Sequence, residues 1–206
     1  MNKNRTLYIV IIANFTALSV LFYFTLKFPL PLIFPSFLDI QFSNLPAIIG
    51  GFALGPIAGS AIVVLRTLIK LPFSTTAMAG EMIDLIIGLS TVLTSSIIYR
   101  KMHSKKGALY AVIAGALVWT IVAVLTNYLF VLDFYINFYF DGAVEPLVGM
   151  LSVIPGINVG NYMEKYILYA AIPFNLLLST IVYLITYLVY KRISNFINYL
   201  NERFSD

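Results

Sequence analysis

The sequence predicts an all-α membrane protein with six transmembrane helices and a re-entrant, proline-rich first loop. Of its 206 residues, 60% are hydrophobic and only 11% are charged, whereas soluble domains are about 45–50% apolar and about 25% charged. The mean hydropathy is +0.91, and the apolar residues gather in runs long enough to cross a bilayer. At about 20 residues per span, the chain holds about six helices in one domain (residues 1–206) and no soluble catalytic unit.

The first helix is predicted over residues 6–26, where an apolar run follows a short basic segment and no small-residue cleavage site comes after it. Three prolines within residues 29–35 then rule out a regular helix. Irregular backbone at membrane depth is tolerated only where protein or a cavity satisfies its polar groups. We therefore expect residues 27–45 to dip back into the protein and to form a wall or lid of a binding site.

The other five helices are predicted where further apolar runs occur, over residues 46–55, 56–72, 77–100, 107–132 and 163–190. The first two of these are joined at Gly55-Pro56, and the shorter of them has the least secure boundary. A long, aromatic-rich connection is expected from Asp133 to about Tyr162. In the tail, residues 191–204, apolar side chains recur every three or four positions, which predicts an amphipathic extension at the membrane interface.

The distribution of basic residues predicts the orientation in the membrane. Cytoplasmic loops of membrane proteins are enriched in Lys and Arg, which also accounts for the net charge of +4. Six spans with the amino terminus inside place nine of the thirteen basic residues on the cytoplasmic side, namely Lys3, Arg5, Arg100, Lys101, Lys105, Lys106, Lys191, Arg192 and Arg203. Both termini are then cytoplasmic, and the three irregular segments, residues 27–45, 72–79 and 133–162, converge on the outer face.

Several classes of function are excluded or unsupported by the same composition. A disordered chain, a soluble binding module or a nucleic-acid reader does not leave so much apolar surface in water. The chain has no cysteine, which excludes thiolate chemistry and Cys-ligated metals. The single histidine, His103, lies in a basic loop without a neighbouring carboxylate, so we expect no metal site. No phosphate-binding glycine loop or Ser-His-Asp arrangement is present, and we expect no catalytic residue and no enzyme.

Two pairs of charged residues fall within neighbouring predicted spans, residues 56–72 and 77–100. Glu81 and Asp84 lie three positions apart on one helix, and Arg66 and Lys70 lie four apart on the preceding one. A charge inside a span costs about 2.5–3.5 kcal/mol on insertion scales, so it marks a partner or a polar cavity. Two interpretations remain open and are compatible: a structural ion-pair cluster that ties the two helices together, or a polar wall of a ligand site.

Two amides stand alone within apolar runs, Asn127 and Asn175. An amide carries two donors and an acceptor oxygen, which suits it to the polar edge of a heterocycle, although hydrogen bonding between helices is an equal alternative. The aromatic residues of 133–140 either stack on a planar ligand or form an interfacial belt. On the first helix, Ala13 and Ala17 are small residues four apart, a spacing that lets another helix approach closely.

Taken together, these residues resemble the substrate-binding S components of energy-coupling-factor vitamin transporters. The resemblance covers nearly the whole chain and rests on Ala13-x-x-x-Ala17, Phe28-Pro-Leu-Pro31, residues 38–46, Gly55-Pro-Ile-Ala-Gly59, residues 80–88 and Ile172-Pro-Phe-Asn175. The proline-rich loop, the Asn-Tyr pair at 127–128 and the Pro-Phe-Asn segment are most similar to the riboflavin-specific members. One departure is Leu178, where those members have a lysine; Arg66, Lys70 or Lys165 are possible substitutes.

The resemblance implies a prokaryotic plasma-membrane protein that binds a vitamin from outside and has no cofactor of its own. It would associate with a membrane T subunit and two cytoplasmic ATPases, which hydrolyse ATP, and would dock through Ala13 and Ala17. Riboflavin, with its phosphate as a variant, is the expected ligand. The residues expected to contact it are Asp39, Asn44, Arg66, Lys70, Glu81, Asp84, Asn127, Tyr128 and Asn175. Alternatives are another vitamin, a stand-alone secondary transporter with Glu81 and Asp84 as its ion site, and a membrane-embedded enzyme.

Overall fold

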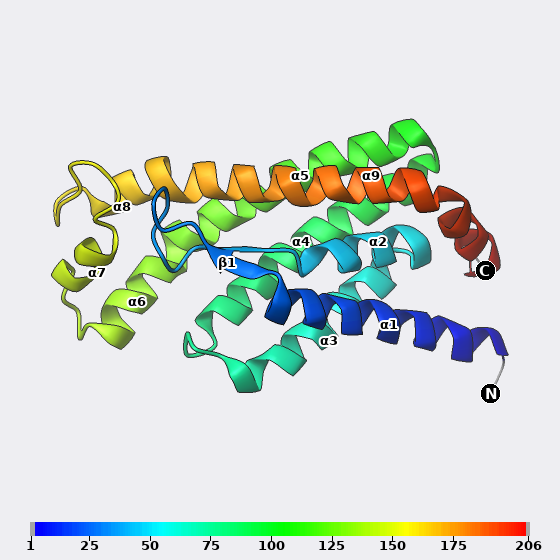
Figure 1. Cartoon of the computed structure of the whole chain (residues 1–206), viewed down its shortest axis with the longest axis horizontal. Helices are drawn as coiled ribbons and strands as arrows, with labels where there is room; N and C mark the ends of the chain where they lie inside the picture. Colours follow the sequence, from blue (N-terminus) through cyan, green and yellow to red (C-terminus); the bar gives the residue numbers. More distant parts are fainter. Residues whose placement is uncertain (1–2, 205–206) are drawn as a thin grey trace.

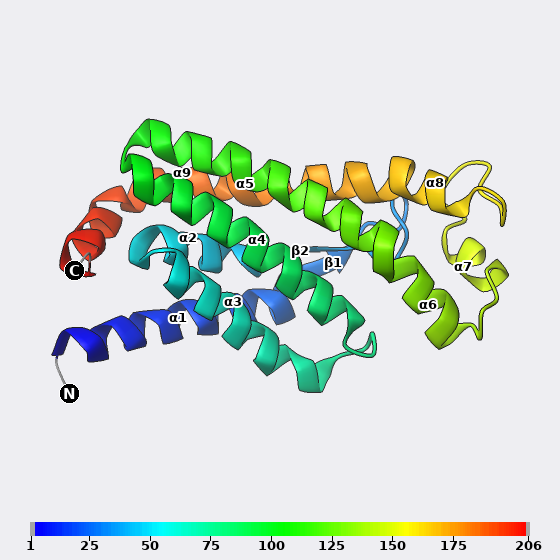
Figure 2. The same cartoon turned by 180° about the vertical axis from the view of Figure 1, so that it is seen from behind.

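The computed structural model describes residues 3–204, those at 3, 4, 201 and 202 without their side chains, so the side chain of Lys3 lies outside the described part. Long helices run side by side along one axis, and both ends of the chain lie at the same end of the molecule (Figure 1; Figure 2). In order, the elements are α1 (Lys3–Thr25), β1 (Lys27–Pro29), β2 (Asp39–Gln41), α2 (Asn44–Leu54), α3 (Pro56–Lys70), η1 (Leu71–Phe73), α4 (Ala79–Met102), α5 (Lys105–Thr126), η2 (Asn127–Val131), α6 (Leu132–Tyr139), α7 (Glu145–Met150), α8 (Tyr162–Tyr166), η3 (Ile167–Ala171) and α9 (Ile172–Phe204).

Five helices of the described chain are long and apolar enough to cross a membrane, by length and composition. They cover Arg5–Thr25, Pro56–Phe73, Ala79–Met102, Lys105–Tyr139 and Tyr162–Leu200. The remaining predicted span, residues 46–55, corresponds to α2. Its 11 residues reach about 16 Å, roughly half of a hydrocarbon core. The structure therefore agrees with an all-α membrane protein but has five spanning helices and one short apolar helix in place of six spans.

The proline-rich segment forms a β-hairpin. β1 pairs antiparallel with β2 in a register that sets Lys27 opposite Gln41. In the turn between the strands, Leu32 is 93% exposed, whereas Phe34 is buried and its ring lies edge-on to Phe174 at 5.2 Å between centroids. The turn is thus held against α9 by one aromatic contact, and the hairpin lies between α1 and α9 (Figure 1).

The predicted long connection from Asp133 to about Tyr162 was placed too early at its start, because the fifth helix does not end at residue 132. A π-helical segment, η2, joins α5 to α6, and the helix continues to Tyr139. Rings four residues apart stack along α6, with centroids of Phe134 and Phe138 at 5.1 Å and of Tyr135 and Tyr139 at 5.4 Å. The helix ends only where two consecutive residues, Asp141 and Gly142, have positive φ.

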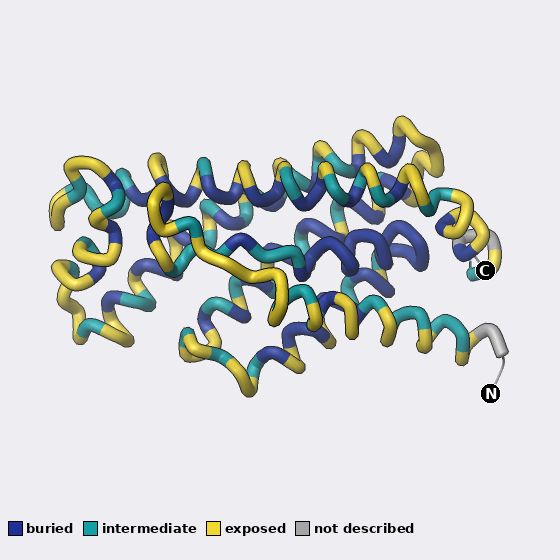
Figure 3. Tube along the Cα trace, viewed as in Figure 1, coloured by how far each residue is buried: buried dark blue, intermediate teal, exposed yellow. Residues whose placement is uncertain are grey.

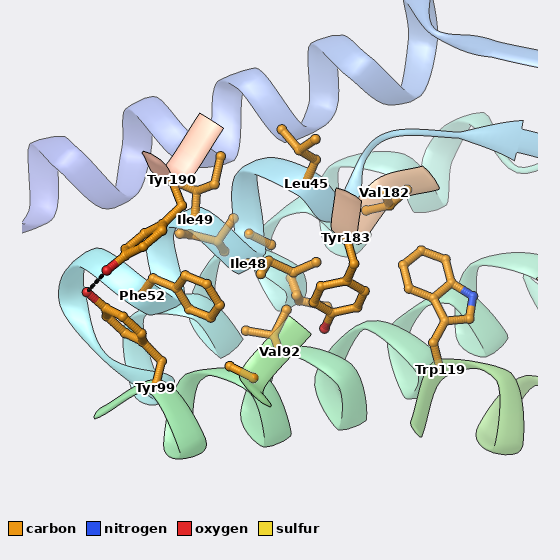
Figure 4. Packing of buried hydrophobic residues seen from close by; sticks show 14 of the residues in the cluster. Leu45, Ile48, Ile49, Phe52, Val92, Tyr99, Trp119, Val182, Tyr183 and Tyr190 are labelled. Atoms are coloured by element: carbon orange, nitrogen blue, oxygen red, sulfur yellow. Dashed lines mark hydrogen bonds between the residues drawn. The ribbon is translucent and has the colours of Figure 1, made fainter. Parts of the chain in front are cut away.

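The main hydrophobic core surrounds α2, whose eleven residues are all buried (Figure 3). α2 and α3 pack closely because their glycines face each other: a Cβ atom at Gly59 would lie 2.8 Å from the Cα of Gly51. Near the chain termini, Phe52 stacks on Tyr99 at 4.6 Å, and the hydroxyl of Tyr99 donates to that of Tyr190 at 3.3 Å (Figure 4). A second, smaller hydrophobic cluster lies at the opposite end, formed by α6, α7, α8 and η3.

The amphipathic tail, residues 191–204, extends α9 without a break and packs on the protein, whereas its place at a membrane interface stays a prediction. Ile197 and Leu200 belong to the main core, and the ring of Phe204 lies 5.4 Å from that of Tyr8 on α1. α1 itself contacts the bundle along one side only. Of the residues in its most apolar stretch, 11% are buried, and most of the helix is partly or fully exposed (Figure 3).

Candidate functional site

A cavity of about 300 Å³ lies at the end of the bundle away from the chain termini. The end of α1, the hairpin, the 75–76 loop, the start of α4, the junction of α5 with α6 and the start of α9 all contribute to its wall. Charged and hydroxyl side chains come from the hairpin, the end of α3, the loop and α4. Aromatic, aliphatic and amide side chains come from α5, α6, α8 and α9, so one wall is polar and the opposite wall is mostly apolar.

Asp84 is the centre of the polar wall. Its Oδ2 atom lies 2.5 Å from Lys70 Nζ and 3.1 Å from Arg66 Nη2, and its Oδ1 atom accepts from Gln41 Nε2 at 3.3 Å. Arg66 is fully buried and also donates to Asn44 Oδ1 at 2.9 Å. Because a buried charge must be paired, this cluster joins α3, α4, α2 and the hairpin.

Both interpretations of the charged cluster find a counterpart in the structure. Arg66 and Asn44 lie behind the wall and do not line the cavity. Their hydrogen bond ties α3 to α2, which fits the structural interpretation. Lys70 and Asp84 line the cavity while remaining in the cluster. The ammonium group of Lys70 also lies 3.7 Å from the ring centroid of Tyr23, a favourable cation–π distance. Its position is thus fixed by an acid on one side and an aromatic ring on the other.

Glu81 lines the same wall but is not part of the ion-pair cluster. Its Oε2 atom accepts from Ser74 Oγ at 2.6 Å and from Thr76 Oγ1 at 3.1 Å. These bonds hold a tight loop in which Ala77 and Met78 both have positive φ, a conformation that costs energy for residues other than glycine. Glu81 therefore stabilises the loop that carries two hydroxyl groups to the cavity edge.

Asp39 lies at the hairpin, 3.1 Å from Lys27 Nζ, and both residues line the cavity. Partial burial lowers the pKa of Lys27, but the hydrogen bond to Asp39 and the nearby negative charges outweigh this effect. The pKa of Lys27 therefore lies above its ordinary value of 10.5. This ion pair closes the open side of the hairpin over the cavity.

Asn127 and Asn175 lie on the apolar wall, and each is held by two hydrogen bonds. Asn127 Nδ2 donates to Ala123 O at 2.7 Å and its Oδ1 accepts from the Tyr166 hydroxyl at 2.7 Å. Asn175 Nδ2 donates to Ala171 O at 2.9 Å and its Oδ1 accepts from Trp119 Nε1 at 3.3 Å. Hydrogen bonding between helices, one of the two alternatives for these amides, is therefore present, and both amides also line the cavity.

The structure places six of the nine expected ligand-contacting residues at this one cavity: Asp39, Lys70, Glu81, Asp84, Asn127 and Asn175. Tyr128 is not among them, because it is 55% exposed on the outside of the bundle. Adjacent residues of a helix point about 100° apart, so Asn127 and Tyr128 do not face the same cavity. Leu178, the departure noted from the sequence, lines the cavity.

Sequence reasoning did not single out several residues that line the cavity: Tyr23, Trp119 and Tyr166 were not named for it, and Lys27, Gln41 and Tyr135 only as parts of the segments 27–45 and 133–140. Lys27 and Gln41 flank the proline-rich segment as the paired ends of a hairpin, which no local pattern indicated. Within the described part of the chain, no group of three metal-ligating side chains occurs. Ala13 and Ala17 lie on α1 away from this cavity, and both are exposed.

Comparison with known proteins adds a family. A model of the family described as "ECF transporter, substrate-specific component" matches residues 7–190. The riboflavin transporter RibU of Staphylococcus aureus (strain TCH60) is 27% identical over 197 residues, which are 96% of this chain and 94% of that protein. The riboflavin transporter FmnP of Bacillus subtilis (strain 168) is 27% identical over 146 residues, 69% and 76% of the two chains. A solved structure, described as the S component of a bacterial ECF transporter, superposes with a TM-score of 0.68 at 25% identity and covers 94% of this chain and 98% of the other.

Proposed function

This chain belongs to the substrate-specific components of ECF transporters, and from that premise we propose that it is the riboflavin-binding subunit of such a transporter. The observation that carries the proposal is a single cavity with one polar and one apolar wall, in a chain similar over nearly its whole length to a riboflavin transporter. Riboflavin has a planar, mostly apolar ring system with a polar edge and a hydroxylated chain, which matches this division of the walls.

In the proposed complex, the flavin ring lies against the apolar wall and the hydroxylated chain points to the polar wall. Trp119, Tyr135 and Phe174 supply aromatic surface for the ring, and the amides of Asn127 and Asn175 face its polar edge. The carboxylates of Glu81 and Asp84 accept from hydroxyl groups. From the hairpin, Phe37 and Leu38 line the cavity, within the segment 27–45 that was expected to form its wall or lid.

The charges of the polar wall favour the uncharged vitamin over its phosphate. Lys70 and Arg66 share one carboxylate, and Lys27 is paired with Asp39, so a phosphate group meets no unpaired lysine or arginine among the charged residues of this wall. It would have to displace an existing acid partner. The same pairing occupies Asp84, one of the two carboxylates named for a coupling ion, and the other, Glu81, accepts from the Ser74 and Thr76 hydroxyls. These partners favour a structural role for both carboxylates over an ion site of a stand-alone secondary transporter.

We further infer six membrane crossings, with the hairpin dipping back from the outer face and both termini in the cytoplasm. The short α2 completes its crossing together with the extended residues before it. Both ends of the chain lie at one end of the molecule (Figure 1), which supports an even number of crossings. The family further suggests a membrane T subunit and two ATPases as partners, with the exposed Ala13 and Ala17 on α1 as the docking face.

Flavin fluorescence tests the proposal directly. Purified, ligand-free protein titrated with riboflavin should quench flavin emission saturably, and riboflavin phosphate should bind more weakly. Replacing Asn127 by Ala should weaken riboflavin binding about five- to 150-fold, because ligand polar groups are left unpaired in a dry site. Asn137→Ala is the matched control, because Asn137 also donates to the carbonyl four residues back, at 2.8 Å, but is exposed outside the cavity. Binding of another vitamin without any response to flavins would overturn the proposal.

A further inference from the structure

The two asparagines of the apolar wall are held in defined orientations by partners that have only one possible role in a hydrogen bond. The indole N–H of Trp119 can only donate, and the carbonyl oxygens of Ala123 and Ala171 can only accept. Asn175 must therefore turn its oxygen toward Trp119 and its nitrogen toward Ala171. Asn127 must likewise turn its nitrogen toward Ala123, which leaves its oxygen opposite the Tyr166 hydroxyl.

This arrangement leaves one hydrogen-bonding group of each amide nitrogen without a partner. An amide nitrogen carries two N–H donors, and the hydrogen bonds to other described residues engage one of them in each asparagine. Both residues are more than nine-tenths buried, with 7% and 6% exposed, and both line the cavity. Leaving a buried donor without a hydrogen bond costs free energy. Each remaining N–H can be satisfied by an acceptor atom of a molecule in the cavity.

Two π-helical turns produce this geometry. η2 begins at Asn127 and η3 begins directly after Tyr166, so the two wider turns come at the point where the helices face each other. Pro173 follows η3 and lacks an N–H for the regular helical ladder, which explains the wider turn there. Such turns are frequent at functional sites. Here they bring the Tyr166 hydroxyl within 2.7 Å of Asn127.

We propose that Tyr166 and Trp119 are positioning residues that fix Asn127 and Asn175 as hydrogen-bond donors, so that this wall recognises acceptor atoms of the ligand. In a flavin these acceptors are the carbonyl oxygens and unprotonated ring nitrogens of the polar edge. The inference rests on the proposed function for the identity of the ligand. The orientation of the amides depends only on groups of this protein, two side chains and two backbone carbonyl oxygens.

A double-mutant cycle on riboflavin affinity tests the role of Tyr166. Tyr166→Phe removes only the hydroxyl, which leaves the Asn127 oxygen without its donor and the amide held by the single bond to Ala123 O. Affinity should then fall about tenfold, the equivalent of one hydrogen bond. In the Asn127→Leu background, the same change should have no further effect, because Tyr166 acts through Asn127. Tyr183→Phe is the control: Tyr183 is also fully buried, and its hydroxyl donates to Thr91 O at 3.3 Å away from the cavity. Affinity should stay within about twofold there.

Asn127→Asp tests whether the amide donates or accepts. The substitution keeps an oxygen opposite Tyr166 and removes both N–H donors. Affinity for riboflavin should fall at least as far as in Asn127→Leu. An affinity equal to or above that of the unmodified protein would mean that the ligand donates to this residue, and the proposal would be wrong.

The remaining outcomes separate the inference from the proposed function. Equal losses from Tyr166→Phe in both backgrounds would mean that its hydroxyl acts on the ligand directly or on the fold, and would overturn the positioning role. If the unmodified protein failed to bind riboflavin, the proposed function would fall, whereas Trp119 fluorescence would still decide the inference. Trp119 is the only tryptophan, and Asn175→Leu should shift its emission to shorter wavelength by removing the acceptor. No shift would overturn the pairing.

Discussion

Asp84 accepts hydrogen bonds from three side chains, those of Gln41, Arg66 and Lys70, and so connects a strand and two helices through one carboxylate. The sequence predicted an interaction between the 66, 70 and 81–84 charges from their helical spacing alone. It did not predict that Glu81 would bond instead to Ser74 and Thr76, because that choice depends on a loop with two positive-φ residues. Spacing places side chains on a helix face, but the facing backbone selects the partner.

Replacing Asp84 by Asn should destabilise the protein strongly. The substitution keeps the shape of the side chain but leaves Arg66, which is fully buried, without its acid. Breaking a buried ion pair costs about 3–5 kcal/mol, so we expect the free energy of unfolding in detergent to fall by an amount of that order. Asp133→Asn is the control, because Asp133 is exposed. Equal stability of the two variants would show that Asp84 is not required to hold the cluster.

The Lys27–Asp39 pair makes a prediction about pH. The pKa of Lys27 is higher in the folded protein than its ordinary value of 10.5, so the ion pair contributes to stability below pH 10.5 and its contribution is lost as pH rises through the folded pKa. The difference in stability between the unmodified protein and Lys27→Met should therefore be constant from neutral pH to about 10 and should shrink above 10.5. Thermal unfolding across this range measures it. A difference that already shrinks between pH 7 and 9 would contradict the assignment.

At the scale of elements, apolar length and the Gly and Pro positions predicted where helices occur better than where they end. Gly55-Pro56 does separate α2 from α3, since Gly55 has φ +94 and proline begins a helix readily. The end of the fifth helix was placed too early because Asp133 was taken as a break. In the structure, aromatic stacking carries the helix on to Tyr139. The π-helical turns carry no local signal apart from Pro173, so Tyr166 was not predicted to reach Asn127.

The exposed face of α1 makes a prediction about coupling. Replacing Ala13 and Ala17 together by Trp should block close approach of a partner helix and abolish ATP-driven uptake in the assembled transporter. Riboflavin binding to the isolated chain should stay within about twofold, because neither residue lines the cavity. Leu18→Trp, at an exposed position on another side of the helix, is the control and should retain uptake. Parallel loss of binding and uptake would instead assign this face to the fold.

At the scale of the whole molecule, composition and charge predicted a membrane protein. They predicted only part of the set of residues that lines the cavity. The cavity gathers residues from four segments that are far apart in the sequence, and six of the nine expected residues were identified because charges and amides are rare in apolar spans. Tyr23 and Trp119 were not assigned to it, and Tyr135 was named only among the aromatic residues of 133–140, because aromatic residues make up 15% of the chain. A signal that is common throughout a sequence cannot single out the few positions that face a cavity.

The orientation in the membrane is testable because the chain has no cysteine. Lys106→Cys, exposed in the first turn of α5, should resist an impermeant thiol reagent added to intact cells and should react after permeabilisation. Ala143→Cys, exposed beyond α6, should react in intact cells. Neither substitution removes the side chain of Ser104, which caps α5 by accepting from Gly107 N at 3.0 Å. The reverse labelling pattern would invert the topology.

The two hydrophobic clusters described above determine where the molecule opens locally. The second, smaller cluster is built from short helices and turns, whereas the main core contains the long helices. We call the end of the molecule that holds the smaller cluster, away from the chain termini, the outer end. Local opening therefore requires less free energy at the outer end, and its backbone amides should exchange hydrogen for deuterium first. Leu38 of the hairpin packs against both clusters, and the cavity lies beside it. A ligand that fills the cavity joins the loosely held end to the rigid one, so ligand affinity also measures the free energy that orders the outer end.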